Sequence, residues 1–163
     1  AICFDCEEDA EDAILRGDVK PGHVVVVRYE GPKGGPGMRE MYKAMKYLYG
    51  QGLNKCTALI TDGRFSGTNN GCFVGHISPE AADGGPIALI KDGDTIHLDV
   101  MRGILELTDV SDEELRERRK SWKRPKKEIP NGYLRLYSKV ASSASKGAVI
   151  DEEQVFTRVE MEE

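Results

Sequence analysis

The sequence predicts an α+β domain in which a mixed, barrel-like β-sheet is flanked by helices. Short apolar runs bounded by Gly, Pro, Asn and Asp recur along the chain, a pattern typical of short strands. Helical segments fall between these runs without the regular strand–helix alternation of a doubly wound sheet. The 163 residues are enough for one domain with a hydrophobic core.

The first half of the chain is dominated by two buried strands and two helices. We expect a helix over 5–16, a turn at 20–22, a strand over 23–29, a glycine loop over 31–37, a helix over 38–49 and a strand over 57–61. Asp5 and Gly17 are residue types that cap the two ends of a helix. Four consecutive valines indicate that the strand over 23–29 is buried on both faces. The helix over 38–49 carries an apolar stripe of Met38, Met41, Met45 and Leu48 that predicts a core-facing side.

The second half of the chain mixes short strands with two further helices. We expect a strand over 72–77, a helix start at 78–82, a strand over 86–91, hairpin strands over 95–100 and 104–107, and helices over 112–122 and 133–142. Ser111 and Glu114 form a capping box for the first of these helices. A basic linker follows at 123–127. Residues 1–150 are predicted to form the domain, and residues 151–163 an acidic C-terminal tail.

Composition excludes several classes of protein. Apolar content of 39% and charged content of 31% fit a globular protein, and the net charge of −5 argues against a nucleic-acid partner. No run of 18 apolar residues predicts a membrane span, and no secretory signal is recognisable, so a cytoplasmic location is expected, or an organellar one in a eukaryote.

Cys3 and Cys6 form a lone C-x-x-C motif without a second pair. Together with Cys56 and Cys72 they are predicted to be free thiols. A redox or metal-binding role of this motif is the alternative.

The segment DGRFSGTNNG at 62–71 leaves the end of a predicted buried strand and presents one hydroxyl, that of Ser66. Loops at strand ends commonly hold reactive side chains. The spacing does not match the G-x-S-x-G elbow of hydrolases, although His76 could serve as a base in a Ser-His-Asp arrangement. If Ser66 acts without a histidine, a nearby metal ion could lower the pKa of its hydroxyl.

A second unusual segment, EGPKGGPGMRE at 30–40, is predicted to run into the helix over 38–49 with Glu40 in its first turn. Free N–H groups at a helix N-terminus, with Lys33 and Arg39, favour an anion, but neither the P-loop nor the dinucleotide fingerprint is present. A tight glycine turn is the alternative. Glu40 could likewise be a Mg²⁺ ligand or a carboxylate that stabilises the helix.

Four stretches of the chain resemble the C-terminal domain of the dihydroxy-acid and phosphogluconate dehydratase family. They are VVVVRYEGPKGGPGMREM at 24–41, ALITDGRFSGTNNGCFVGHISPEAADGGPIALIKDGD at 58–94, SDEELRERRKSW at 111–122 and GYLRLYSKVASSASKGAV at 132–149. Phe65 matches the branched-chain dihydroxy-acid enzymes, whereas sugar-acid and phosphogluconate dehydratases tend to carry Met there.

The resemblance implies a fold similar to the swivelling small domain of aconitase. It also implies dehydration of 2,3-dihydroxy carboxylates, such as 2,3-dihydroxyisovalerate, to 2-keto acids in isoleucine and valine biosynthesis. The family uses Mg²⁺ and an iron–sulfur cluster. By its place in DGRFSG, Ser66 matches the base that removes the C2 proton, and by its place in GGPGMRE, Glu40 matches a Mg²⁺ ligand. The resemblance further implies substrate contacts from Arg64, Gly67, Thr68 and Gly37.

The remaining site residues of the family lie in an N-terminal, cluster-binding domain that this chain lacks. The resemblance therefore implies that the isolated chain is inactive, and that its partners are that N-terminal domain, a second copy in a homodimer and a small dihydroxy acid. Three alternatives remain open from the sequence: a sugar-acid dehydratase domain, a non-catalytic anion-binding module and a structural docking domain.

Overall fold

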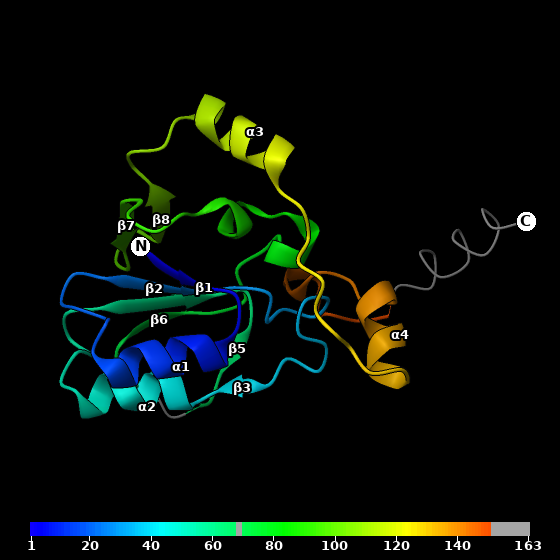
Figure 1. The fold of residues 1–163 in the computed structure, drawn as a ribbon, viewed down its shortest axis with the longest axis horizontal. Coiled ribbons are helices and arrows are strands. Elements are labelled where there is room, and N and C mark those ends of the chain that lie inside the picture. The colour runs from blue at the N-terminus through cyan, green and yellow to red at the C-terminus, as the bar shows by residue number, and fades with distance from the viewer. Residues whose placement is uncertain (68–69, 151–163) are drawn as a thin grey trace, which may run out of the picture.

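The computed structural model describes residues 1–67 and 70–150. Its centre is a parallel sheet in which β1 (Ile2–Phe4), β2 (Val24–Val27), β4 (Ala58–Thr61) and β6 (Cys72–Val74) lie side by side in chain order (Figure 1). Val25, Val26 and Val27 are fully buried, so the apolar run that predicted a strand covered on both faces is confirmed.

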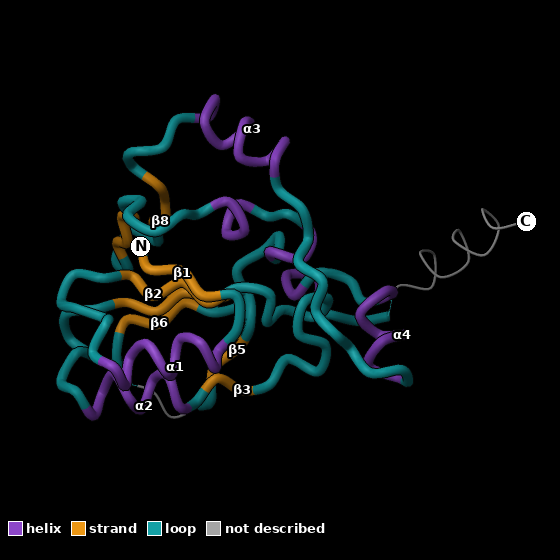
Figure 2. The backbone as a smooth tube through the Cα atoms, viewed as in Figure 1, coloured by secondary structure: helices purple, strands orange, loops and turns teal. Residues whose placement is uncertain are grey.

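Two helices cover one face of the sheet, as Figure 2 shows. They are α1 (Glu7–Arg16) and α2 (Lys43–Gly50), and the core between them and the sheet includes Ile14, Leu48 and Leu59. Gly17 ends α1 in the left-handed conformation, with φ of 79°, as its residue type predicted. The N-cap of α1 is Cys6 rather than Asp5.

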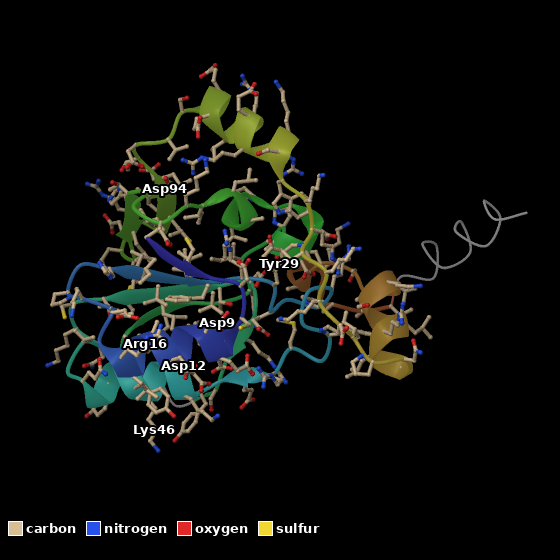
Figure 3. All side chains as sticks on the ribbon, viewed as in Figure 1. Asp9, Asp12, Arg16, Tyr29, Lys46 and Asp94 are labelled. Carbon is tan, nitrogen blue, oxygen red and sulfur yellow. The ribbon has the colours of Figure 1, made fainter. Side chains whose placement is uncertain are left out.

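The opposite face is covered by two 3₁₀ helices and a hairpin, and a further helix packs on the outside of the second 3₁₀ helix. These are η1 (Ala81–Asp83), η2 (Pro86–Leu89), the antiparallel strands β7 (Ile96–Asp99) and β8 (Ile104–Leu107), and α3 (Asp112–Ser121). The predicted hairpin is confirmed, as is the cap, because Ser111 accepts a hydrogen bond from the N–H of Glu114. Arg118 fastens α3 through two hydrogen bonds to Asp94, which Figure 3 labels.

A linker over 123–131 leads from α3 to α4 (Tyr133–Val140), which η3 (Ala144–Lys146) follows. Tyr29, labelled in Figure 3, fixes the start of this linker at the carboxyl end of β2. Its hydroxyl accepts a hydrogen bond from Trp122 Nε1 at 3.0 Å, and its carbonyl oxygen accepts one from Lys127 Nζ at 2.9 Å. The linker thereby lies against the segment from which the glycine loop begins.

The expected barrel-like sheet is wrong for the described residues, because the parallel sheet stays open and the hairpin is separate from it. The prediction missed β1, which has only three residues. With β1 in place, β1, α1 and β2 form a regular parallel crossover unit. The fold is a mixed α/β arrangement, and the likeness to the small domain of aconitase stays a prediction.

Three local assignments are also corrected. Residues 86–91 begin with the 3₁₀ helix η2, in which Pro86 takes the first position, and the predicted helix at 78–82 is the short η1. Glu40 is not in a first helical turn: Glu40–Met41 is the strand β3, and α2 starts at Lys43. No helix among the described residues is long and apolar enough to cross a membrane.

Candidate functional site

The two segments that the sequence singled out lie side by side. Strand β3 (Glu40–Met41) pairs in parallel with β5 (Arg64–Phe65), so that Glu40 is opposite Arg64 and Met41 opposite Phe65. The backbone N–H of Ser66 extends this contact by donating to the Met41 carbonyl oxygen at 3.1 Å. The predicted base and the predicted Mg²⁺ ligand therefore occupy neighbouring positions on paired backbones.

The side chains around this pairing divide into anchors and exposed groups. Phe65 is the anchor: it packs on the core beneath α1 and α2, with its ring centroid 5.7 Å from that of Phe73. Ser66 is half-buried, whereas Glu40 and Arg64 on the two strands are exposed. Among the described residues, no group is hydrogen-bonded to the Ser66 hydroxyl.

The predicted substrate contacts are brought together only in part. Arg64 donates from Nε to the carbonyl oxygen of Met38, which follows Gly37 directly. Gly37 has φ of +94°, and a Cβ there would lie 3.6 Å from Leu134 of α4. Gly67 is exposed beside Ser66. Thr68 lies outside the described residues.

A buried carboxylate, that of Asp62, holds the segments behind the site. It is fully buried and accepts hydrogen bonds from the N–H groups of Tyr29, Glu30 and Ala81 at 3.1, 3.0 and 2.8 Å. Burial raises the pKa of Asp62, while the three donors act in the opposite direction. Asp62 thus ties the end of β4 to the end of β2 and to η1.

Glu80 performs the same task for the glycine loop. Its buried carboxylate accepts from the N–H groups of Lys33 and Gly34 at 2.9 and 2.8 Å. Burial raises the pKa of Glu80, and these two donors oppose the shift. Sequence analysis missed both carboxylates. The position of Asp62, directly after a buried strand and before a glycine, was the one available signal; nothing around Glu80 marked its role.

Gly31 and Gly34 of the loop are required by close packing. A Cβ at Gly31 would lie 2.7 Å from a carboxylate oxygen of Glu80, and one at Gly34 would lie 2.8 Å from the Tyr29 Cα. A Cβ at Gly63, on the neighbouring loop, would lie 2.8 Å from the Glu30 Cβ. The richness in glycine that suggested an anion-binding loop therefore reflects the approach of backbone to backbone and to buried carboxylates.

A model of the dihydroxy-acid/6-phosphogluconate dehydratase C-terminal domain matches residues 1–148. The chain belongs to this family. The dihydroxy-acid dehydratase of Aquifex aeolicus is 58% identical to it over 151 residues, which are 93% of this chain and 27% of that enzyme. The corresponding enzymes of Pyrococcus abyssi and Campylobacter jejuni are 56% and 53% identical over 93% and 94% of the chain.

The chain spans about a quarter of the length of the curated relatives it matches, 27% in each of these three. It therefore corresponds to the C-terminal domain of a dehydratase of this family, and the matched region contains both Glu40 and Ser66. The resemblance that the sequence motifs suggested is confirmed.

The geometry of this dehydratase domain weighs against the anion-binding alternative at the glycine loop. The loop leads into strand β3 and not into a helix, so the helix N-terminus on which that hypothesis relied is elsewhere. The N–H groups of Lys33 and Gly34 are occupied by Glu80. An external anion at these two groups would have to displace a carboxylate of the protein itself.

The cysteines do not assemble a metal centre in the described part of the dehydratase domain, where no three Cys, His, Asp or Glu side chains gather around a common point. All four cysteines are free. Burial raises the pKa of the Cys3 thiol to about 12, which keeps it protonated and unreactive. The ring of His97 contacts Glu106, and no described histidine is hydrogen-bonded to Ser66, so nothing here assembles a serine-hydrolase triad.

Proposed function

We propose that this chain is the C-terminal part of a dihydroxy-acid dehydratase. The reaction is loss of water from 2,3-dihydroxy carboxylates of the 2,3-dihydroxyisovalerate type, giving 2-keto acids for branched-chain amino-acid biosynthesis. The observation that carries the proposal is the pairing of Glu40 with Arg64 immediately before Ser66. The names of the relatives from Aquifex aeolicus and Pyrococcus abyssi support the substrate class.

Ser66 is the proposed base. The C2 proton of the substrate passes to Ser66 Oγ in its alkoxide form and the C3–O bond breaks. The C3 hydroxyl departs as water with the proton that Ser66 took up, which restores the alkoxide. The enol that remains tautomerises to the 2-keto acid. Ser66 suits this role because its backbone is fixed at Met41 and its neighbour Phe65 is anchored in the core, so the hydroxyl is held in place.

Glu40 is the proposed Mg²⁺ ligand from this domain. Mg²⁺ is usually held by one or two carboxylates together with substrate and water, so one exposed carboxylate beside the Ser66 loop fits as a single contribution to a shared site. When bound, Mg²⁺ would supply the positive charge that lowers the pKa of a hydroxyl next to it. The four dispersed cysteines do not fit an iron–sulfur cluster, and we assign no step of this chain to one.

The proposed substrate contacts are Arg64, Gly67, Thr68 and Gly37. Arg64 is exposed and, after its bond to Met38, retains N–H donors suited to a substrate carboxylate. Gly67 and Gly37 allow close approach because they carry no side chain.

The remainder of the site is assigned to other parts of the enzyme. Residues 1–150 form the domain, residues 151–163 its acidic tail, and the N-terminal domain of the same enzyme supplies the cluster. We infer that the isolated chain is inactive, that the complete enzyme is a homodimer, and that it works in the cytoplasm or in an organelle.

The test is formation of 2-keto acid from 2,3-dihydroxyisovalerate. The chain is joined to its native upstream coding region and reconstituted without oxygen with iron, sulfide and Mg²⁺. Ser66→Ala is expected to abolish turnover with unchanged cluster content and thermal stability. Ser121→Ala, which removes an exposed hydroxyl from the end of α3, is the matched control and should remain active.

A second arm examines Glu40. Glu40→Gln should raise the Mg²⁺ concentration needed for half-maximal activity by about tenfold, since a neutral amide is a weaker ligand. Glu117→Gln, on the exposed side of α3, should leave the Mg²⁺ dependence unchanged. Full activity of Ser66→Ala would contradict the assignment of Ser66 as the base. An enzyme that contains cluster and Mg²⁺ but dehydrates sugar acids in place of 2,3-dihydroxyisovalerate would contradict the proposed substrate class.

A further inference from the structure

A cavity of about 720 Å³ lies where the glycine loop, the linker and α4 meet. Its basic side chains come from segments far apart in the sequence: Lys33, Arg124, Lys127, Arg135 and Lys139. Two acidic side chains, Asp83 and Glu128, line the same cavity, and Glu30 is paired with Lys127, so the positive groups outnumber these negative groups by two in a chain whose net charge is −5. Figure 1 shows the linker running beside the glycine loop before it turns into α4.

Lys33 of the glycine loop and Lys127 of the linker are both engaged in ion pairs. Lys33 Nζ is 2.7 Å from Asp83, and Lys127 Nζ is 3.1 Å from Glu30. These contacts hold one wall of the cavity in a defined shape.

The two arginines keep most of their donors. Arg124 gives one hydrogen bond to the Lys33 carbonyl oxygen at 2.8 Å, and Arg135 gives one to the Asn131 side chain at 2.5 Å. A guanidinium carries five N–H donors, so each arginine can still bind an anionic group in bidentate fashion. Both arginines are positioned by a hydrogen bond before any ligand arrives, which lowers the entropic cost of binding.

The α4 wall presents a continuous polar face. Arg135, Ser138 and Lys139 lie at spacings that place them on one side of the helix, Asn131 lies just before its start, and all four line the cavity. The cavity therefore has a polar helix face on one side and the glycine loop on the other. Its volume lies within the range of about 300–1,000 Å³ that small-molecule sites occupy.

We propose that this cavity binds a small organic molecule with two or more negative charges, a phosphate ester or a di- or tricarboxylate. A concave site of this volume with excess positive charge suits a small anion better than an extended polyanion, and the acidic balance of the whole chain disfavours a nucleic acid. None of the described residues in the proposed dehydration site lines the cavity, so the proposal goes beyond that reaction.

The experiment titrates the full 163-residue chain with inorganic pyrophosphate and, separately, with citrate, by calorimetry and by thermal unfolding. The ligand is expected to bind with a dissociation constant below millimolar and to raise the unfolding midpoint, because it binds only the folded state. Arg135→Gln should weaken binding by about tenfold, the usual effect of losing a hydrogen bond to a charged group. Added salt should weaken it as well.

Arg116→Gln is the matched control, since Arg116 lies on α3, pairs with the exposed Glu113 and does not line the cavity, so the same loss of charge should leave affinity unchanged. Arg124→Gln is a second variant, and circular dichroism verifies that each variant is folded. Binding of pyrophosphate alone would identify a phosphate ligand, and binding of citrate alone a carboxylate. Absence of binding for both probes at millimolar concentration, or equal weakening by Arg116→Gln and Arg135→Gln, would overturn the proposal.

Discussion

The backbone N–H of Ser66 donates a hydrogen bond to the carbonyl oxygen of Met41, with 3.1 Å between nitrogen and oxygen. This contact joins two segments that are 25 positions apart and that sequence analysis treated as independent loops. It extends the two-residue ladder between β3 and β5 by one bond. The position of Ser66 relative to Glu40 is consequently determined by backbone pairing, and the substitutions below test the packing behind it.

Replacing Gly63 with Ala should destabilise the domain by about 2 kcal/mol, because the new Cβ would lie 2.8 Å from the Glu30 Cβ and 3.0 Å from its carbonyl oxygen. At Gly67, which directly follows Ser66, an added Cβ meets no atom within 4 Å, so Gly67→Ala should change stability by less than about 0.5 kcal/mol. Urea unfolding of both variants measures the difference. Equal free energies of unfolding for Gly63→Ala and Gly67→Ala would show that the backbone around Gly63 can accommodate a Cβ without loss of stability.

Asp62→Asn should destabilise the domain by about 3 kcal/mol, since the carboxylate accepts three buried N–H groups and an amide would set its own donors against them. Asp12→Asn is the control, because Asp12 is exposed on α1. Hydrogen exchange provides a local measurement: the N–H groups of Tyr29, Glu30 and Ala81 should exchange faster in the Asp62 variant. Unchanged exchange at these three amides would contradict the assigned role.

The Asp94–Arg118 pair should make stability depend on acid pH. Burial opposes ionisation of Asp94, but Arg118 and the Lys91 N–H outweigh it, and the pKa of Asp94 falls below its usual value of 3.8. The pair therefore makes its full contribution to the free energy of unfolding at pH values above 3.8. This contribution is lost as the pH falls through the lower pKa of Asp94 in the folded state. Asp94→Asn should cost about 3 kcal/mol near neutral pH and should lack this acid loss. The same pH dependence of the free energy of unfolding in the original protein and in Asp94→Asn would refute this role of the pair.

The cysteines should react with an aromatic disulfide reagent at very different rates. Cys56 is exposed, whereas burial raises the pKa of Cys3 to about 12, so at mildly alkaline pH Cys56 should be labelled first and Cys3 only on unfolding. Cys56→Ser should remove the fast phase of labelling. A fast phase that persists in this variant and maps to Cys3 by mass spectrometry would disprove the assignment.

The sequence identified the elements whose patterns are local. The valine run of β2, the hairpin of β7 and β8 and the Ser111 cap all follow from neighbouring residues, and the structure has each of them. Strand β1 was missed because three residues carry too little periodicity, and β3 was taken for helix because Met38, Met41 and Met45 share a helical spacing.

The sequence predicted the two motifs of the site but not that they lie side by side in the fold. Glu40 and Ser66 stood out by their neighbours in the sequence, but their proximity depends on a ladder between β3 and β5 that no local pattern encodes. Asp62 and Glu80 act through backbone N–H groups of distant segments, at sequence separations of 32 or 33 and of 46 or 47 residues. Long-range contacts of this kind require the fold before they can be recognised.

The carboxylate of Glu80, seated against the N–H groups of Lys33 and Gly34, has a kinetic consequence for the proposed dehydratase. Because these N–H groups are already hydrogen-bonded to a carboxylate of the same polypeptide, we expect the loop to be ordered before substrate arrives. Substrate encounter should then require no slow ordering of this loop, and the association rate should be set by diffusion into the site and by the movement of other parts of the enzyme.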